Sequence, residues 1–125
     1  MNDTLHHSQV IRSHELRGVR AFIEATKHLI VTHGWCPSSR VSDDSETLDL
    51  QKALLAVDFG SGFDGVTTEI LYVKTRNFLH TLLCGESLLS FDEKPGNTQS
   101  NVLAFLDYAL LMLDKKGIDD AYCDN

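Results

Sequence analysis

The sequence predicts an all-α protein with four main helices in one compact domain with long loops. Two observations support this fold class. Apolar residues recur at helical spacing in several segments, and polar or glycine-containing stretches that favour turns separate those segments. The 125 residues suit a single domain, and a hydrophobic content of 42% is enough to build its core. We therefore expect one helical domain over residues 1–125, with frayed ends at 1–13 and 118–125.

The first helix is expected over residues 14–33, with Gly34 as its C-terminal stop. Its apolar face consists of Val19, Phe22, Ile23, Thr26, Leu29 and Ile30. The polar stretch 37–46 begins with a proline and predicts an exposed loop. Within it, Asp43 and Glu46 have the spacing of a capping box for a second helix of about three turns. That helix would bury Leu50, Ala53, Leu54 and Val57.

A wide apolar stripe predicts the third helix, which should end near Cys84 and Gly85. The stripe consists of Leu71, Tyr72, Thr75, Phe78, Leu79, Leu82 and Leu83. Residues 86–97 are expected to form a loop, in which Pro95-Gly96 suits a type II turn.

The charge balance and the distribution of apolar residues exclude two classes of partner. The formal net charge is −7, and no segment concentrates lysine and arginine, so nucleic acid binding is not expected. No stretch approaches the roughly 20 apolar residues of a membrane span, and the N-terminus lacks the apolar region of a signal peptide. We expect a cytoplasmic protein whose three scattered cysteines are reduced.

The stretch AVDFGSGFDGV at 56–66 has the glycine spacing G-x-G-x-x-G, which cradles a phosphate in dinucleotide-binding proteins. That role requires a strand before the glycines and a helix after them, within a larger sheet. The stretch also resembles the phosphate loops of the actin and sugar-kinase class, whose two lobes need a longer chain. No alternating series of strands follows, so we interpret Gly60, Gly62 and Gly65 as a flexible connection between helices.

Two histidine and cysteine pairs have spacings that could complete a tetrahedral zinc shell, His33 with Cys36 and His80 with Cys84. Neither is the compact C-x2-C knuckle of a zinc site, and the second pair lies toward the outer side of its apolar stripe. Taken singly, Cys36 is interpreted as a small buried side chain and His33 as a cation near a helix C-terminus. We therefore expect no metal and no other cofactor.

No combination of residues identifies a reaction. Cys36 with His33 as its base is a candidate nucleophile pair, but the sequence supplies no recognisable oxyanion-stabilising group. The adjacent carboxylates Asp92 and Glu93 do not by themselves define an acid and a base at a useful separation. We expect a protein that is not an enzyme and assign no catalytic residue.

Three stretches resemble the landmarks of a family of small, functionally uncharacterised bacterial proteins: HGWCPSS at 33–39, QKALLAV at 51–57 and SFDEKPGNTQSNVLAFLDYAL at 90–110. Members of that family pair a Gly-Trp-Cys after the first helix with a Trp-Asn-Asp, Pro-Gly and Thr-Gln turn before the last. The matching residues are Gly34, Trp35, Cys36, Pro95, Gly96, Thr98 and Gln99. Phe91-Asp92-Glu93 stands here in place of Trp-Asn-Asp. The chain also resembles proteins carried as mobile gene cassettes. The resemblance implies a fold and no catalytic residues.

The two loops that carry this resemblance are expected to lie near one another and to form a small-molecule pocket. Its candidate ligand-binding residues are Trp35, Cys36, Phe91, Asp92 and Asp107. Asp107 interrupts an otherwise apolar run, so a buried carboxylate there would need a partner such as Arg17, Arg20 or Arg76. Simple exposure of Asp107 is the other interpretation.

The last helix is the main reason to expect a homodimer or a larger assembly. It begins at Thr98, a good N-cap, and continues to a stop at Gly117, with Asp107 as the only charge in its apolar run. The apolar residues surround its axis: Val102, Leu103, Phe105, Leu106, Tyr108, Ala109, Leu110, Leu111, Met112 and Leu113. A second copy would cover the face that a four-helix domain leaves in water. The predicted function is therefore an accessory or interaction protein that self-associates through Leu103, Leu110 or Leu111, and the alternative is the small-molecule binder.

Overall fold

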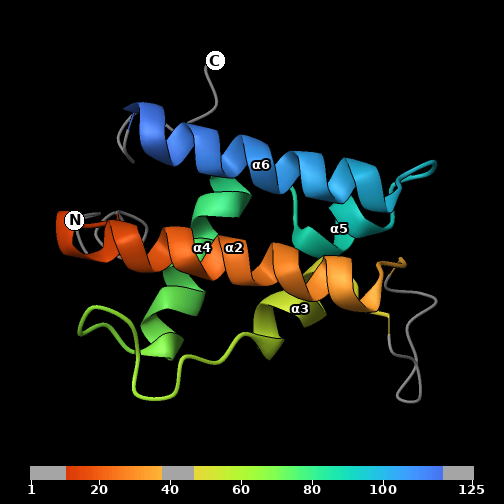
Figure 1. Cartoon of the computed structure of the whole chain (residues 1–125). Helices are drawn as coiled ribbons and strands as arrows, with labels where there is room; N and C mark the ends of the chain where they lie inside the picture. The colour runs from red at the N-terminus through yellow and green to blue at the C-terminus, as the bar shows by residue number, and fades with distance from the viewer. Residues whose placement is uncertain (1–10, 38–46, 117–125) are drawn as a thin grey trace.

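The computed structural model of the protein describes residues 11–37 and 47–116, and this part of the chain contains helices and no β-strand (Figure 1). The predicted all-α class is confirmed. The elements are the 3-10 turn η1 (Ser13–Glu15), α2 (Leu16–His33), α3 (Leu50–Ala56), α4 (Thr68–Leu82), α5 (Leu88–Asp92) and α6 (Gln99–Lys116). The four longer helices correspond to the four that the sequence predicts. The expectations for residues 1–10 and 117–125 lie outside the described ranges.

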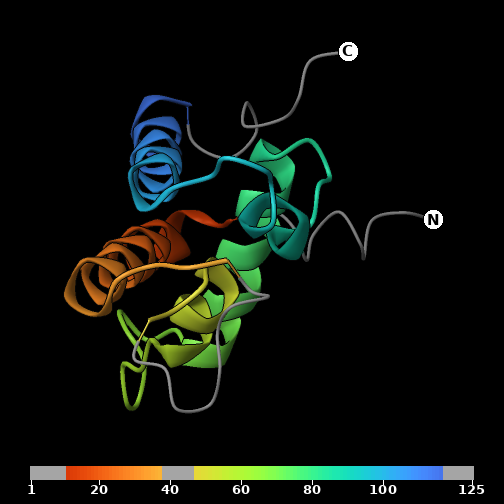
Figure 2. The same cartoon turned by 90° about the vertical axis from the view of Figure 1, so that its right-hand side faces the viewer.

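Helix α2 is the centre of the domain. It packs against α3, α4 and α6, and Figures 1 and 2 show α6 on one side of it and α3 on the other, while α4 crosses it. Gly18 lets α4 approach closely, because a Cβ at this position would lie 2.7 Å from Cδ2 of Leu71. The predicted core face of α2 is confirmed for five fully buried residues, namely Val19, Phe22, Ile23, Thr26 and Ile30.

The C-terminal end of α2 and the N-terminal end of α6 lie where the sequence predicts them. Gly34 follows α2 with φ of +85°, and its N–H donates to the carbonyl of Ile30 at 2.7 Å. Thr98 caps α6, since its Oγ1 accepts a hydrogen bond from the N–H of Asn101 at 3.2 Å. Local capping chemistry therefore sets where α2 ends and where α6 begins.

The second helix differs from its prediction in length and in its cap. Helix α3 has seven residues, about two turns, and its N-cap is Asp49, which accepts from the N–H of Lys52 at 2.6 Å. The predicted capping box of Asp43 and Glu46 lies outside the described residues. The predicted core of this helix is buried as expected, at Leu50, Ala53, Leu54 and Val57.

Helix α5 lies inside the segment 86–97, which the sequence predicts to be a loop. Ser87 caps it by accepting from the N–H of Ser90 at 3.0 Å. Leu88 is buried, whereas Leu89 is exposed. Five residues make little more than one turn, which is too short for apolar periodicity to show.

The glycine-rich segment connects α3 to α4 and follows a helix, so the strand that a dinucleotide site requires does not precede it. All three glycines have positive φ. Gly62 is the most constrained, because a Cβ there would lie 2.3 Å from the carbonyl oxygen of Val66. Phe59 anchors the segment by packing edge-on against Phe22, with ring centroids 6.0 Å apart. The segment connects two helices, as the sequence predicts, and its flexibility stays a prediction.

Two further sequence expectations can be compared with the structure. Cys36 is a free thiol, but Cys84 is disulfide-bonded, so the expectation of reduced cysteines is wrong for Cys84. Cys123 lies outside the described residues. No helix in the described ranges is both long enough and apolar enough to cross a membrane.

Candidate functional site

Trp35 and Asp92 join the two loops that the family resemblance points to. The indole N–H of Trp35 donates to Oδ1 of Asp92 at 2.9 Å. The backbone N–H of Leu50 donates to both oxygens of the same carboxylate, at 3.2 and 3.0 Å. Asp92 therefore links the segment after α2, the start of α3 and the end of α5. The prediction that the two loops lie near one another is confirmed.

The Asp92 carboxylate is fully buried, with an exposed fraction of 0%. Burial raises the pKa of Asp92 from 3.8 to about 6, although the hydrogen bonds from Trp35 and Leu50 act in the opposite direction. The negative charge of Asp49 raises this pKa further. Because the carboxylate accepts N–H groups of its own chain, its role in this arrangement is to hold Trp35 and the start of α3 in place.

Backbone hydrogen bonds fix the strand-like segment that carries Trp35. Oε1 of Gln99 accepts from the N–H of Trp35 at 2.9 Å. Leu48 pairs with the same segment in an isolated parallel bridge, donating to the carbonyl of Gly34 at 2.9 Å and accepting from the N–H of Cys36 at 3.2 Å. Gln99, the last residue of the Thr-Gln motif, is thus a positioning residue that sequence reasoning leaves without a role.

The candidate nucleophile pair is not assembled. The thiol of Cys36 lies 3.0 Å from Oγ1 of Thr47, within hydrogen-bond distance for sulfur. His33, the proposed base, is exposed at the end of α2, and no hydrogen bond joins it to Cys36 in the described part of the chain.

A hollow of about 550 Å³ opens beside Trp35, and we call it the Trp35 hollow. It lies between the segment after α2 and the turn before α6. Its lining residues are Trp35, Cys36, Pro37, Glu93, Lys94, Pro95, Gly96, Asn97 and Gln99. Two of the five predicted site residues, Trp35 and Cys36, therefore line the hollow. Asp92 does not line it, but its hydrogen bond holds the indole of Trp35 in place.

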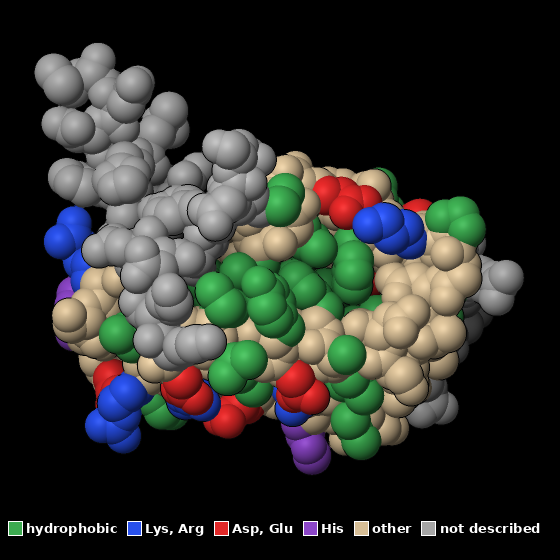
Figure 3. Space-filling view, turned by 90° about the horizontal axis from the view of Figure 1, so that it is seen from above, with side chains coloured by type: hydrophobic (Ala, Val, Ile, Leu, Met, Phe, Trp, Pro, Cys, Tyr) green, Lys and Arg blue, Asp and Glu red, His purple; other side chains and the backbone are tan. Residues whose placement is uncertain are grey.

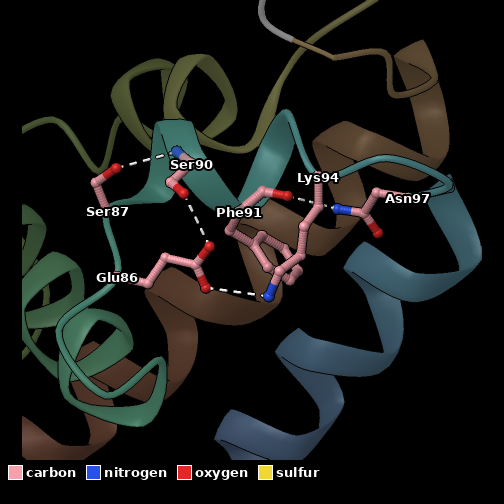
Figure 4. Close-up of polar contacts among 6 residues, drawn as sticks. All are labelled: Glu86, Ser87, Ser90, Phe91, Lys94 and Asn97. Atoms are coloured by element: carbon pink, nitrogen blue, oxygen red, sulfur yellow. Dashed lines mark hydrogen bonds and ion pairs between the residues drawn. The ribbon is translucent and has the colours of Figure 1, made fainter.

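The turn on the far wall of the hollow is held by side chains of α5 and its flanks (Figure 4). The amine of Lys94 reaches Oε1 of Glu86 at 3.2 Å, and Oε2 of Glu86 accepts from the hydroxyl of Ser90 at 2.9 Å. The hydrogen bond from Ser90, and then that from Lys94, lowers the pKa of Glu86. On the other side, Nδ2 of Asn97 donates to the carbonyl of Phe91 at 2.8 Å.

The predicted type II turn at Pro95-Gly96 agrees with the structure. The N–H of Asn97 donates to the carbonyl of Lys94 at 3.1 Å, and Gly96 has φ of +80°, the sign that a type II turn requires at this position. A Cβ on Gly96 would meet nothing within 4 Å, so this corner of the turn faces open space.

Phe91 and Asp107 do not line the Trp35 hollow. Phe91 packs against Phe105 of α6, with ring centroids 4.9 Å apart. Asp107 is exposed and forms an ion pair with Lys27 across the contact between α2 and α6. Asp107 therefore lies outside this hollow and its ligand role stays a prediction, while its ion-pair partner is a lysine that the sequence pattern does not single out.

The four candidate zinc ligands do not form a metal-binding cluster. Within the described ranges, no group of three or more histidine, cysteine, aspartate or glutamate side chains could hold a metal ion. Burial lowers the pKa of His80, and the charge of Arg76 lowers it further. Cys84 is committed to a disulfide.

The face of α6 that points away from α2 carries exposed hydrophobic side chains. Figure 3 views this side of the molecule and shows hydrophobic residues gathered near its middle, with paired charges along one edge. Tyr108 is 47% exposed and Leu111 is 55% exposed. The opposite face of α6 is buried, at Val102, Leu106, Ala109 and Leu113. We call the outward surface the α6 face and define it by Ala104, Tyr108 and Leu111.

Comparison with protein-family models matches residues 15–110 to a family of unknown function, DUF6197. Comparisons with curated proteins and with solved structures give no match. The matched range runs from η1 into α6 and contains Trp35, Asp92 and Gln99. Because the family model covers most of its length, the chain belongs to the DUF6197 family of unknown function.

Proposed function

We propose that the protein is a non-enzymatic accessory or interaction protein that self-associates through the α6 face. The observation that carries this proposal is the exposed apolar row of Ala104, Tyr108 and Leu111. Intervals of four and three residues place side chains along one seam of a helix, as in paired helices. Half-buried apolar side chains border the row, namely Leu103, Phe105, Leu110 and Met112.

The charges at the edge of the α6 face favour a second copy of the chain as the partner that covers this face. A net charge of −7 opposes the approach of two chains. Along this edge, however, Lys27 pairs with Asp107 and Arg20 pairs with Asp114, so the local charges cancel. Two-fold association would bring the same apolar row of each copy together without uncompensated like charges at its border.

The substitution Leu111→Lys tests this proposal. We expect the wild-type protein to have a dimer mass, or a larger one, by size exclusion with light scattering at micromolar concentration. A two-fold contact would bury two lysines per dimer, so dissociation should become roughly 100-fold easier while helix content stays unchanged.

Leu55→Lys is the matched control. Leu55 is 60% exposed on α3, and its substitution introduces the same charge away from the α6 face. This variant should keep the wild-type mass. A monomeric wild-type protein, or equal dissociation by both lysine variants, would contradict the proposal.

The cellular setting of this proposal comes from the sequence resemblance. It implies a small bacterial protein carried as a mobile gene cassette, and a cytoplasmic location is part of our proposal. In this proposal, the protein would associate with its second copy through the α6 face.

Small-molecule binding in the Trp35 hollow is the second candidate function. Its support is the volume of about 550 Å³, within the range of roughly 300–1,000 Å³ typical of ligand pockets. A ligand that binds the native state should raise the melting temperature by mass action. A library of small metabolites with no member that raises it would argue against this candidate.

A further inference from the structure

We propose that a pocket between α3 and α4 binds a compact organic ammonium, namely a primary amine that carries one ring or a short alkyl chain. The pocket, which we call the α3–α4 pocket, has a volume of about 300 Å³. It shares no residue with the α6 face or with the Trp35 hollow, so this inference is independent of both candidate functions. Its lining residues are Phe22, Leu54, Leu55, Val57, Thr68, Glu69, Tyr72 and Val73.

The α3–α4 pocket has apolar walls that are open to solvent. Leu55 of α3 is 60% exposed and Val73 of α4 is 37% exposed, and both line the pocket. Phe22 and Leu54 line it as well but are fully buried, so they close it on the side of the core. A single exposed apolar side chain is ordinary, whereas two that line one pocket offer apolar surface that a ligand can remove from water.

Glu69 is the charged residue of this lining, and its carboxylate is available to a ligand. It is exposed in the first turn of α4. Its side chain forms no hydrogen bond or ion pair with any residue that the structure describes. The hydroxyl of Thr68, by contrast, already accepts a hydrogen bond from the N–H of Phe59 at 3.2 Å. We therefore assign the polar recognition to Glu69.

Two cations on the same helices do not line the pocket and leave this carboxylate uncompensated. Lys52 is one turn before Leu55 on α3. The guanidinium of Arg76 lies over the Tyr72 ring, 5.5 Å from its centroid. Arg76 is about two turns beyond Glu69 on α4, roughly 10 Å along the helix. Neither cation forms an ion pair with Glu69 in the described part of the chain.

These features specify the charge and the size of the ligand. A free carboxylate beside apolar surface attracts a cation with an apolar body and repels an acid, and the net charge of −7 acts in the same direction. A primary ammonium also has three N–H donors for the carboxylate oxygens of Glu69. The volume lies at the low end of the range of roughly 300–1,000 Å³ for ligand pockets, so the apolar part must be compact.

Three ring compounds of similar size and different charge test this ligand class: phenethylamine, phenethyl alcohol and hydrocinnamate. Each is titrated into isotope-labelled protein at neutral pH, and the amide resonances are followed by NMR. We expect phenethylamine to shift resonances of α3 and of the first turns of α4 saturably, with a dissociation constant on the order of 1 mM. It should bind roughly fivefold more tightly than the alcohol, which is what an exposed ion pair adds. Hydrocinnamate should bind more weakly than the alcohol.

Two glutamate variants test whether Glu69 selects the amine. Glu69→Gln should lower the affinity for phenethylamine to that for the alcohol and leave the alcohol unaffected. Glu24→Gln removes the same charge from an exposed position on α2 outside the pocket, and it should leave both affinities unchanged. Equal loss of amine affinity in both variants would reveal an effect of net charge alone and would overturn the proposal.

Two leucine variants test the apolar wall of the pocket. Leu55→Ala should weaken the amine and the alcohol alike, roughly threefold, because apolar contact is lost. Leu89→Ala truncates a leucine that is 53% exposed on α5, outside the pocket, and should change neither affinity. The proposal is wrong if phenethylamine gives no saturable shifts on α3 and α4, if hydrocinnamate binds as tightly as the amine, or if Leu55→Ala has no effect.

Discussion

Replacing Asp92 with alanine is expected to lower the free energy of unfolding at neutral pH by on the order of 3 kcal/mol. The substitution leaves the indole N–H of Trp35 and the N–H of Leu50 without their acceptor, in a place that is fully buried. It also leaves a cavity. Urea denaturation followed by circular dichroism measures the change.

Asp58→Ala is the control for this prediction. The carboxylate of Asp58 also accepts a backbone hydrogen bond, from Gly60 at 2.8 Å, but it is exposed. Its loss should cost about 1 kcal/mol or less. If Asp92→Ala costs no more than Asp58→Ala, the buried carboxylate does not hold the loops together.

Asp92 is also expected to give the protein a component of stability that decreases as the pH rises. Its pKa in the folded chain is raised to about 6, whereas its ordinary value is 3.8. Between these values the folded chain holds a proton that the unfolded chain has released, so folding takes up a proton. The component is therefore complete below about pH 4 and is lost as the pH rises through 6.

Comparison with Asp92→Asn isolates this component from the other carboxylates. The free energy of unfolding of the wild-type protein minus that of the variant should fall by about 2–3 kcal/mol between pH 4 and pH 7. Urea denaturation of both proteins at matched pH values gives this difference. A difference that stays constant or rises with pH would show that burial does not raise the pKa of Asp92.

The long helices could be predicted because their signals are local. Val19, Phe22 and Ile23 recur at helical spacing, and Gly34 and Thr98 have chemistry that ends or begins a helix. Helix α5 could not be found in this way, because five residues carry no readable period. The sequence overestimates the length of α3, because Asp43 and Glu46 suggest a capping box at residues 43–46. The observed N-cap is Asp49, three residues further along the chain than Glu46.

The candidate site was predictable only in outline. The two motifs indicated which loops to examine, but spacing along the chain could not show that the Asp92 carboxylate meets the Trp35 indole, 57 positions away. The partner of Asp107 was missed for the same reason, since Lys27 lies 80 positions from it. Contacts of this kind arise from how α2 packs with α6 and how α3 packs with α5, and a periodic pattern contains no record of them.

Hydrogen–deuterium exchange at two protein concentrations tests the proposed self-association most directly, because it maps the contact without any substitution. On going from low to high micromolar concentration, peptides that cover α6 (Gln99–Lys116) should exchange more slowly. Peptides from α3 (Leu50–Ala56) and α4 (Thr68–Leu82) should be unchanged. Exchange that does not depend on concentration anywhere, or protection confined to α3 and α4, would contradict association through the α6 face.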